Sequence, residues 1–72
     1  MNGLRRLRER KFMTQAQLAA ALGLRRQATI SSWESGEDRP RLENMRKLCE
    51  VLNVSPDELL SALDTEEGKT IQ

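Results

Sequence analysis

The sequence predicts an all-α fold built from five short helices, and three observations support this prediction. Apolar residues recur at the three- and four-residue spacing of one helix face, most clearly at Met45, Leu48, Cys49 and Leu52. Capping residues and glycines, which start and stop helices, separate the apolar runs. No segment shows the alternation of apolar and polar residues that marks a half-buried strand. A chain of 72 residues allows one small domain with a thin core.

The first helix is expected over residues 4–11. Leu4 and Leu7 lie three residues apart and share one face, while arginines occupy most of the other positions. Phe12 and Met13 interrupt this pattern, so we expect the helix to end before them.

The second helix is expected to follow Thr14 and to run to Leu22. Thr14 and Gln17 have the spacing of a capping box, in which the Thr14 hydroxyl accepts from the backbone N–H of Gln17 and the Gln17 amide reaches back to the Thr14 backbone. Gly23 ends the helix, because a left-handed residue is needed there and glycine adopts that conformation freely.

Ile30 and Trp33, which lie three residues apart, predict a third helix that ends at Gly36. Trp33 could stack on a nucleic-acid base, but its spacing from Ile30 favours a place in the core. A loop over residues 37–40 is expected next, since Pro40 disfavours helical backbone at the residue before it.

The fourth helix is expected to end at Asn53 in a left-handed conformation. Ser55 and Glu58 have the spacing of a second capping box, which starts the fifth helix. Three leucines form the apolar face of that helix: Leu59, Leu60 and Leu63. We assign residues 1–63 to the folded domain and expect residues 64–72 to form a polar, disordered tail.

Composition excludes several classes of function. Cys49 is the only cysteine and there is no histidine, which excludes an internal disulfide and leaves no set of four ligands for structural zinc. The usual general base of a nucleophilic triad is missing as well, so we expect no enzymatic activity, metal or cofactor. The longest weakly polar run, residues 19–24, is far too short to span a bilayer, and no secretory signal is evident. We expect a soluble domain that binds a partner.

Charge is distributed unevenly along the chain. Residues 1–41 contain nine basic and four acidic side chains, a net charge of +5. Residues 42–72 contain three basic and seven acidic ones, a net charge of −4. The asymmetry is typical of a domain whose N-terminal half meets a polyanion. A well-solvated surface with chance clustering explains the same numbers equally well.

The centre of the chain combines two helices with a glycine-containing turn, which is the arrangement of a helix-turn-helix. Ala19 lies where the third helix must approach the second, and a larger side chain would push the two apart. The side of the third helix opposite Ile30 and Trp33 is small or polar. It contains Gln27, Ala28, Thr29, Ser31 and Ser32. Such a face can enter the major groove of DNA and offer hydrogen bonds to base edges.

With these residues the sequence resembles the XRE-type helix-turn-helix family, to which phage λ-type repressors and Cro proteins belong. The matching residues, in order and at nearly the family's spacing, are Leu4-Arg5-Arg6-Leu7-Arg8-Glu9, Thr14-Gln15, Leu18-Ala19, Leu22-Gly23, Gln27-Ala28-Thr29-Ile30-Ser31, Trp33-Glu34, Gly36, Arg39-Pro40, Leu42, Leu48, Leu52-Asn53-Val54-Ser55 and Asp57-Glu58-Leu59-Leu60. Each piece alone is weak, and together they are specific. The resemblance implies a compact five-helix λ-repressor-like domain.

The resemblance also implies roles for individual residues. Gln27 would pair bidentately with an adenine, Ala28 would touch a thymine methyl, and Gln15 would hold a phosphate at the start of the second helix. The residues expected to read bases are Gln27, Ala28, Thr29, Ser31 and Ser32. Those expected to bind phosphates are Gln15, Arg25, Arg26, Arg39 and Arg41. Arg8 and Glu34 match a structural ion pair between the first and third helices.

The sequence departs from the family pattern in the turn. Seven positions separate Gly23 from Ile30, one more than family members usually have. The position that usually offers a Ser or Thr cap is therefore Arg25 or Arg26, and neither can accept a capping hydrogen bond. One interpretation is a longer turn that directs both arginines toward DNA phosphates. The other is a third helix that starts one residue away, which would shift the base-reading residues by one; we favour the longer turn.

We therefore expect a sequence-specific, double-stranded-DNA-binding regulator of transcription, with repression favoured. One domain reads few base pairs, so a homodimer on a palindromic operator is expected. The dimer contact is expected on the fifth helix and the turn between the fourth and fifth helices, with Leu60 and Leu63 exposed there. The resemblance places such a protein in a bacterial or phage setting, in the cytoplasm and at the nucleoid, without a membrane or small-molecule partner. The alternative is a protein-interaction module, such as an antitoxin or adaptor, built on the same fold.

Overall fold

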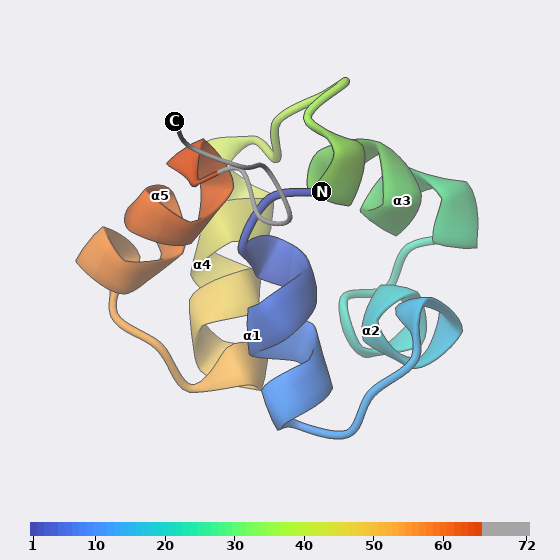
Figure 1. The fold of residues 1–72 in the computed structure, drawn as a ribbon. Coiled ribbons are helices and arrows are strands. Elements are labelled where there is room, and N and C mark those ends of the chain that lie inside the picture. The colour runs from blue at the N-terminus through green and yellow to red at the C-terminus, as the bar shows by residue number, and fades with distance from the viewer. Residues whose placement is uncertain (66–72) are drawn as a thin grey trace.

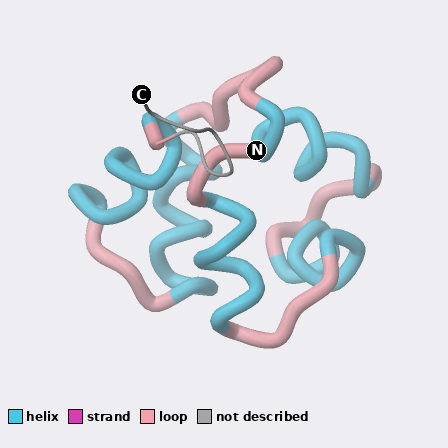
Figure 2. The backbone as a smooth tube through the Cα atoms, in the orientation of Figure 1, coloured by secondary structure: helices cyan, strands magenta, loops and turns pink. Residues whose placement is uncertain are grey.

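The computed structural model describes residues 1–65, which contain five helices and no strand (Figure 1). The helices are α1 (Leu4–Arg10), α2 (Gln15–Ala21), α3 (Gln27–Ser35), α4 (Leu42–Leu52) and α5 (Pro56–Asp64). Short loops join them, as the tube in Figure 2 shows. The predicted all-α fold with five helices is confirmed, and each helix end lies close to its expected position.

The helices form two packed pairs that α1 joins. α2 packs against α3, α4 packs against α5, and α1 contacts both α3 and α5. Figure 1 shows α1 in front of α4, with α5 on one side and the α2–α3 pair on the other. Each helix contributes one apolar side chain with no solvent exposure to the core. These are Leu4, Leu18, Ile30, Leu48 and Leu59.

Helix ends follow the expected local chemistry. The Thr14 hydroxyl accepts from the Gln17 N–H at 3.0 Å, and the Thr14 N–H donates to Gln17 Oε1 at 2.8 Å, so the first capping box is confirmed. Gly36 and Asn53 have φ angles of 88° and 57°, so both adopt the left-handed conformation that ends α3 and α4. Trp33 is buried, as its spacing predicted.

The second capping box is only half formed. The Ser55 hydroxyl accepts from the Glu58 N–H at 3.1 Å. The Glu58 carboxylate does not return to the Ser55 backbone, because it accepts from the guanidinium of Arg10 on α1, 3.4 Å away. The Glu58 side chain therefore joins α5 to α1 and does not complete the cap of its own helix.

The end of α5 differs from expectation in two details. Leu63 is buried, because it lies four residues after Leu59 on the same inward face, whereas Leu60 lies one position further round and is 44% exposed. Asp64 is the last residue of α5 and pairs with Arg39, so helix and ion pair extend one residue into the predicted tail. The rest of the expected disordered tail, residues 66–72, lies outside the described residues.

Asn2, which no sequence pattern had singled out, ties the N-terminus to the end of α3. Its backbone N–H donates to the Glu34 carbonyl, and its side-chain amide donates to the Trp33 carbonyl, both at 2.7 Å. The Asn2 Oδ1 accepts from the N–H of Leu4 at the start of α1. The bonds to the Glu34 carbonyl and the Leu4 N–H satisfy groups that helix ends leave without intrahelical partners, and the three bonds together fix α1 against α3.

Candidate nucleic-acid interface

The turn between α2 and α3 is closed by backbone hydrogen bonds to the last turn of α2. The Leu24 N–H donates to the Ala19 carbonyl at 2.9 Å, and the Gly23 N–H donates to the Ala20 carbonyl at 3.1 Å. Gly23 adopts a φ of 76°, a conformation that its lack of a Cβ makes easy. Ala19 is only 4% exposed and belongs to the core between the helices. The turn thus holds α2 and α3 as one unit, side by side in Figure 1.

α3 begins at Gln27, so the helix start is not shifted relative to the expected one. Arg26 is the N-cap residue, in an extended conformation and without a capping hydrogen bond from its side chain. Arg25 and Arg26 are both exposed, and their side chains make no hydrogen bond or ion pair with another described residue. Two cations at the positive end of a helix are unfavourable in isolation.

The residues expected to read bases lie along the solvent side of α3. Gln27 and Ala28 are exposed in its first turn, and Thr29, Ser31 and Ser32 are half-buried. None of these five side chains is charged. The N-terminal half of α3 therefore presents a small, neutral, hydrogen-bonding surface.

Arg8 and Glu34 form a buried ion pair between α1 and α3. Arg8 Nε donates to Glu34 Oε2 at 2.6 Å and Arg8 Nη2 donates to Oε1 at 3.3 Å, a two-pronged contact. Glu34 has no exposed surface, and Arg8 is 8% exposed. Arg8 Nη1 also donates to the Met13 carbonyl at 2.7 Å, which fixes the loop before α2. The structure thus brings together the two residues that the resemblance paired.

Gln15 and Gln27 extend this ion pair to the surface of α3. Gln15 Nε2 donates to Glu34 Oε1 at 3.0 Å, and Gln27 Nε2 donates to Gln15 Oε1 at 3.2 Å. The Gln15 amide presents its N–H to the accepting oxygen of Glu34 and its own oxygen to the N–H of Gln27, so the two contacts fix which end of each amide faces inward. The sequence predicted separate roles for the two residues, phosphate binding for Gln15 and base reading for Gln27. Sequence reasoning missed the link, because no spacing along the chain reveals a contact between two helices.

The residues expected to bind phosphates do not form one cluster. Gln15 opens α2, and Arg25 and Arg26 lie in the turn before α3. Arg39 and Arg41 belong to the loop that follows α3, at its other end in Figure 1. With nine residues, α3 is about 13 Å long, which is close to the width of a DNA major groove, about 12 Å.

The two arginines after α3 have different surroundings. Arg39 pairs with Asp64 of α5. Arg41 is exposed, is the N-cap residue of α4, and has no ion pair or hydrogen bond from its side chain to another described residue. Glu37 and Asp38, also exposed, precede them in the same loop.

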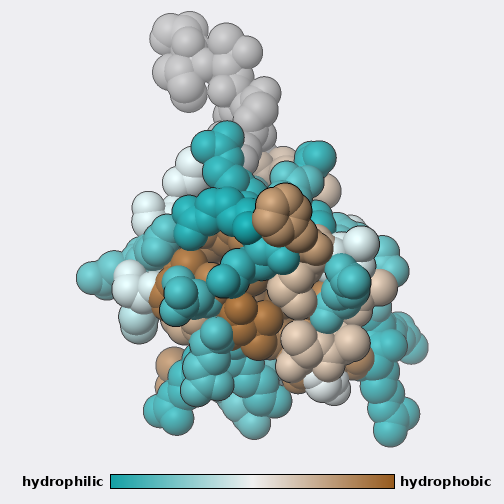
Figure 3. All heavy atoms as spheres, turned by 90° about the horizontal axis from the view of Figure 1, so that it is seen from below, coloured by the Kyte–Doolittle hydropathy of each residue, from teal (hydrophilic) through white to brown (hydrophobic). Residues whose placement is uncertain are grey.

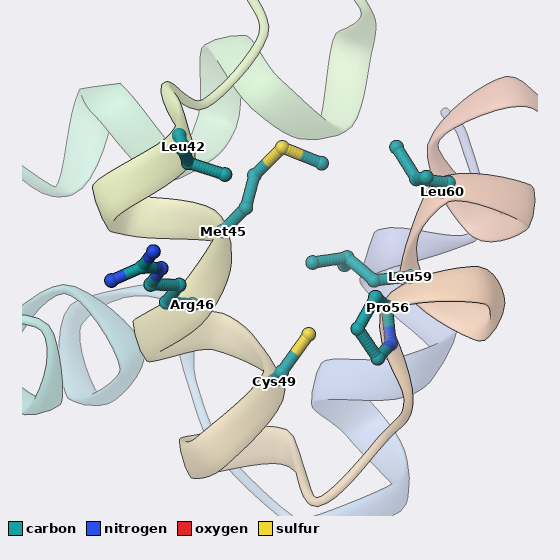
Figure 4. A pocket seen from close by; sticks show the side chains of 7 residues that line it. All are labelled: Leu42, Met45, Arg46, Cys49, Pro56, Leu59 and Leu60. Atoms are coloured by element: carbon teal, nitrogen blue, oxygen red, sulfur yellow. The ribbon is translucent and has the colours of Figure 1, made fainter.

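A second surface feature lies between α4 and α5. It is an apolar groove of about 390 Å³, lined by Leu42, Met45, Arg46, Cys49, Pro56, Leu59 and Leu60. Figure 4 shows the Met45 side chain extending toward Leu60 and the Cys49 sulfur facing Pro56 and Leu59, with the Arg46 guanidinium directed away. Burial, with a smaller effect from the Glu50 carboxylate, raises the pKa of the Cys49 thiol, so this cysteine is protonated at neutral pH.

Large apolar side chains reach solvent at few other places. Leu42 and Leu60, at the rim of the groove, are 69% and 44% exposed, and Phe12, in the loop after α1, is 93% exposed. Figure 3 shows hydrophilic side chains around most of the outline and hydrophobic ones in small patches between them. The described residues contain no cluster of three or more side chains suited to a metal ion. None of their helices has the length and apolar character needed to cross a membrane.

This fold and the α2–turn–α3 unit define the class of the protein. A family model described as helix-turn-helix matches residues 4–59, and the chain belongs to this family. The match confirms the family expected from the sequence motifs, and it covers α1 to α4 and the first turn of α5.

Two curated relatives are similar over the same region. The HTH-type transcriptional activator BcrR of Enterococcus faecalis is 45% identical over 58 residues, which cover 81% of this chain and 28% of that protein. The cryptic phage CTXphi transcriptional repressor RstR of Vibrio cholerae is 36% identical over 58 residues, covering 81% of this chain and 51% of that protein. The chain therefore spans about half, or less, of the relatives that it matches.

Proposed function

We propose that this domain binds duplex DNA at specific sequences, with α3 in the major groove, and regulates transcription. The observation that supports this most strongly is the hydrogen-bonded chain from the buried Arg8–Glu34 pair through Gln15 to Gln27. It holds an exposed amide in a fixed orientation at the start of α3. A buried network that ends in a positioned surface amide is suited to recognition, because the side chain is ordered before the ligand arrives.

The orientation of this amide selects a base. Gln27 uses one N–H of Nε2 to donate to Gln15, so its Oε1 and its second N–H are available to a ligand. An oxygen acceptor beside an N–H donor matches the N6 donor and N7 acceptor that adenine presents in the major groove. Ala28, one residue on, would contact a neighbouring thymine methyl. We therefore place an adenine opposite Gln27 in each half-site.

Phosphate contacts at both ends of α3 would set the depth and angle of docking. At one end lie Gln15, Arg25 and Arg26, and the guanidinium groups of the two arginines have no partner among the described residues. At the other end lies Arg41. Because α3 is about as long as the groove is wide, the two groups would reach opposite backbones. A phosphate would also offset the unfavourable cations at the start of α3.

Regulation of transcription is supported by the names of the relatives, one an activator and the other a repressor. We favour repression for this domain. A protein seated in the major groove excludes other proteins from the same base pairs without needing a further activity. Such action would take place on bacterial or phage DNA.

A homodimer on a palindromic operator completes the proposal. One domain contacts few base pairs, and two-fold pairing doubles the site that is read. The apolar α4–α5 groove, with Leu42 and Leu60 at its rim, supplies a surface on which a second copy can bury apolar area. Leu63 is no longer available for this contact, since it is buried in the monomer. Sedimentation of the protein on a duplex with one and with two half-sites measures the stoichiometry.

Replacing Gln27 with alanine is expected to relax base preference at one position of the half-site and to cost about 1–3 kcal/mol on the preferred duplex. Affinity for an unrelated duplex should stay nearly constant, because the phosphate contacts remain. The measurement is a binding titration against duplexes that carry each of the four base pairs at that position. Unchanged preference would contradict the assignment and move base reading to Arg26 or Ala28.

Replacing Arg41 with alanine is expected to weaken binding to all duplexes by a similar factor. The slope of log K against log salt concentration should fall by about 0.9, the contribution of one phosphate. Lys47→Ala is the matched control, because it removes an exposed cation of α4 that we assign no DNA contact. If Arg41→Ala weakened only the preferred duplex, Arg41 would read bases and the phosphate assignment would be wrong.

A further inference from the structure

The Arg39–Asp64 ion pair connects the loop after α3 with the last residue of α5. One nitrogen of the guanidinium, Nη2, donates to the Asp64 carboxylate Oδ1. The side chains are 52% and 69% exposed, so water and salt screen the pair. An exposed pair of this kind adds little to the stability of a fold. Its main effect is on the charge that Arg39 offers to a ligand.

Helix stability does not explain an acidic residue at position 64. The C-terminal end of a helix carries partial negative charge, and a carboxylate there is unfavourable. Asp57, by contrast, lies in the first turn of α5, where an acidic side chain is favourable. Asp64 thus opposes its own helix and is compensated by Arg39, a residue of the surface that we assign to DNA.

The net charge of the loop after α3 depends on whether Arg39 is paired with Asp64. Glu37 and Asp38 are both exposed and balance Arg39 and Arg41 in number. When Asp64 neutralises Arg39, Arg41 is the cation that remains without a partner among the described residues of this loop. A DNA backbone that approaches this end of α3 therefore meets two acidic side chains, the unpaired guanidinium of Arg41 and the guanidinium of Arg39, which is already paired with Asp64.

We propose that Asp64 competes with a DNA phosphate for Arg39, so that docking of this loop exchanges a carboxylate for a phosphate. The inference rests on the proposed DNA-binding function. Neither side chain of the pair reads a base, so Asp64 lowers affinity for every sequence alike and leaves base preference unchanged. Because the competing pair is exposed, its effect is largest at low salt and shrinks as salt screens it.

The test is a set of binding titrations with a labelled random-sequence duplex at low and at near-physiological salt. Asp64→Asn is expected to tighten binding by up to about five-fold at low salt, the upper end of the range that exposed ion pairs span. Asp57→Asn is the matched control, since it makes the same chemical change on the same helix. In an Arg39→Ala background, Asp64→Asn should act no differently from Asp57→Asn. Thermal unfolding of each variant checks that the fold is intact.

Three results would overturn the inference. If Asp64→Asn matched Asp57→Asn in the Arg39 protein, the two acids would act only through overall charge. If Asp64→Asn weakened binding, the carboxylate would position Arg39 rather than compete for it. If neither the unaltered chain nor any variant bound duplex DNA, the proposed DNA-binding function itself would fail. This outcome is distinct from the first two.

Discussion

Replacing Glu34 with alanine is expected to lower the free energy of unfolding by about 3–5 kcal/mol, because it leaves the buried Arg8 guanidinium without its counter-charge. The Gln15 amide loses its acceptor in the same variant. Small domains have stabilities of roughly 5–15 kcal/mol, so this loss removes a large part of the total. The same change should also free Gln27 from its fixed orientation and reduce base preference.

Urea unfolding followed by the fluorescence of Trp33, the only tryptophan, measures this loss. Glu9→Ala is the matched control. Glu9 pairs with Arg5 at 3.1 Å, but both side chains are more than half exposed, and such pairs contribute about 0–1 kcal/mol. Equal effects of the two substitutions would show that burial of the Arg8–Glu34 pair is not what stabilises the junction of α1 and α3.

Replacing Leu48 with alanine is expected to cost about 2–5 kcal/mol of unfolding free energy. Leu48 is fully buried in the core, so its truncation loses apolar burial and leaves a cavity. Leu42, on the same helix α4, is 69% exposed. The identical substitution there should change stability by no more than about 0.5 kcal/mol. Thermal or urea unfolding of the two variants, side by side, gives the difference.

A small difference between the two alanine variants would contradict the placement of α4 in the structure. Leu42→Ala adds a second measurement, because Leu42 lines the groove that we assign to the dimer contact. A folded Leu42→Ala protein that lost dimer formation on a palindromic duplex would support that assignment.

Local rules were sufficient to predict most of the helix starts and ends. The Thr14–Gln17 capping box and the left-handed residues Gly36 and Asn53 are recognised from a few neighbouring positions, because capping bonds and left-handed backbone depend on those positions alone. The spacing of Ile30 and Trp33 identified the inward face of α3 for a similar reason. The resemblance supplied the Arg8–Glu34 pair, which spacing alone does not reveal.

Features that depend on contacts between distant segments were not predictable in this way. Leu60 and Leu63 both belong to the leucine-rich face of α5, and the packing of α5 against α1 and α4 covers the side that contains Leu59 and Leu63 and leaves Leu60 exposed. The Glu58 carboxylate accepts from Arg10 of α1 and not from the Ser55 backbone. Asn2 joins helix ends that lie 31 residues apart along the chain. No local rule anticipates the left-handed φ of 56° at Phe12, a conformation that bulky residues rarely adopt.

The candidate site shows the same division. The composition of α3 identified its neutral outward face, and the turn arginines were visible as a departure from the family spacing. The link from Glu34 through Gln15 to Gln27 requires the crossing of α2 and α3. The capture of Arg39 by Asp64 requires α5 to return beside the loop after α3. The first contact orients the Gln27 amide, and the second neutralises the charge of Arg39, so each changes how a predicted site residue can meet a ligand.

Selection from a random duplex DNA library at near-physiological salt, followed by sequencing after several rounds, tests the central claim most directly. We expect enrichment of a palindrome with an adenine at a fixed position of each half-site and half-sites about one helical turn apart, roughly 34 Å. Retention of the palindrome by Arg41→Ala and loss of the adenine by Gln27→Ala would assign the two kinds of contact. A folded sample that enriched no sequence would contradict sequence-specific DNA binding and favour a protein-interaction module on the same fold.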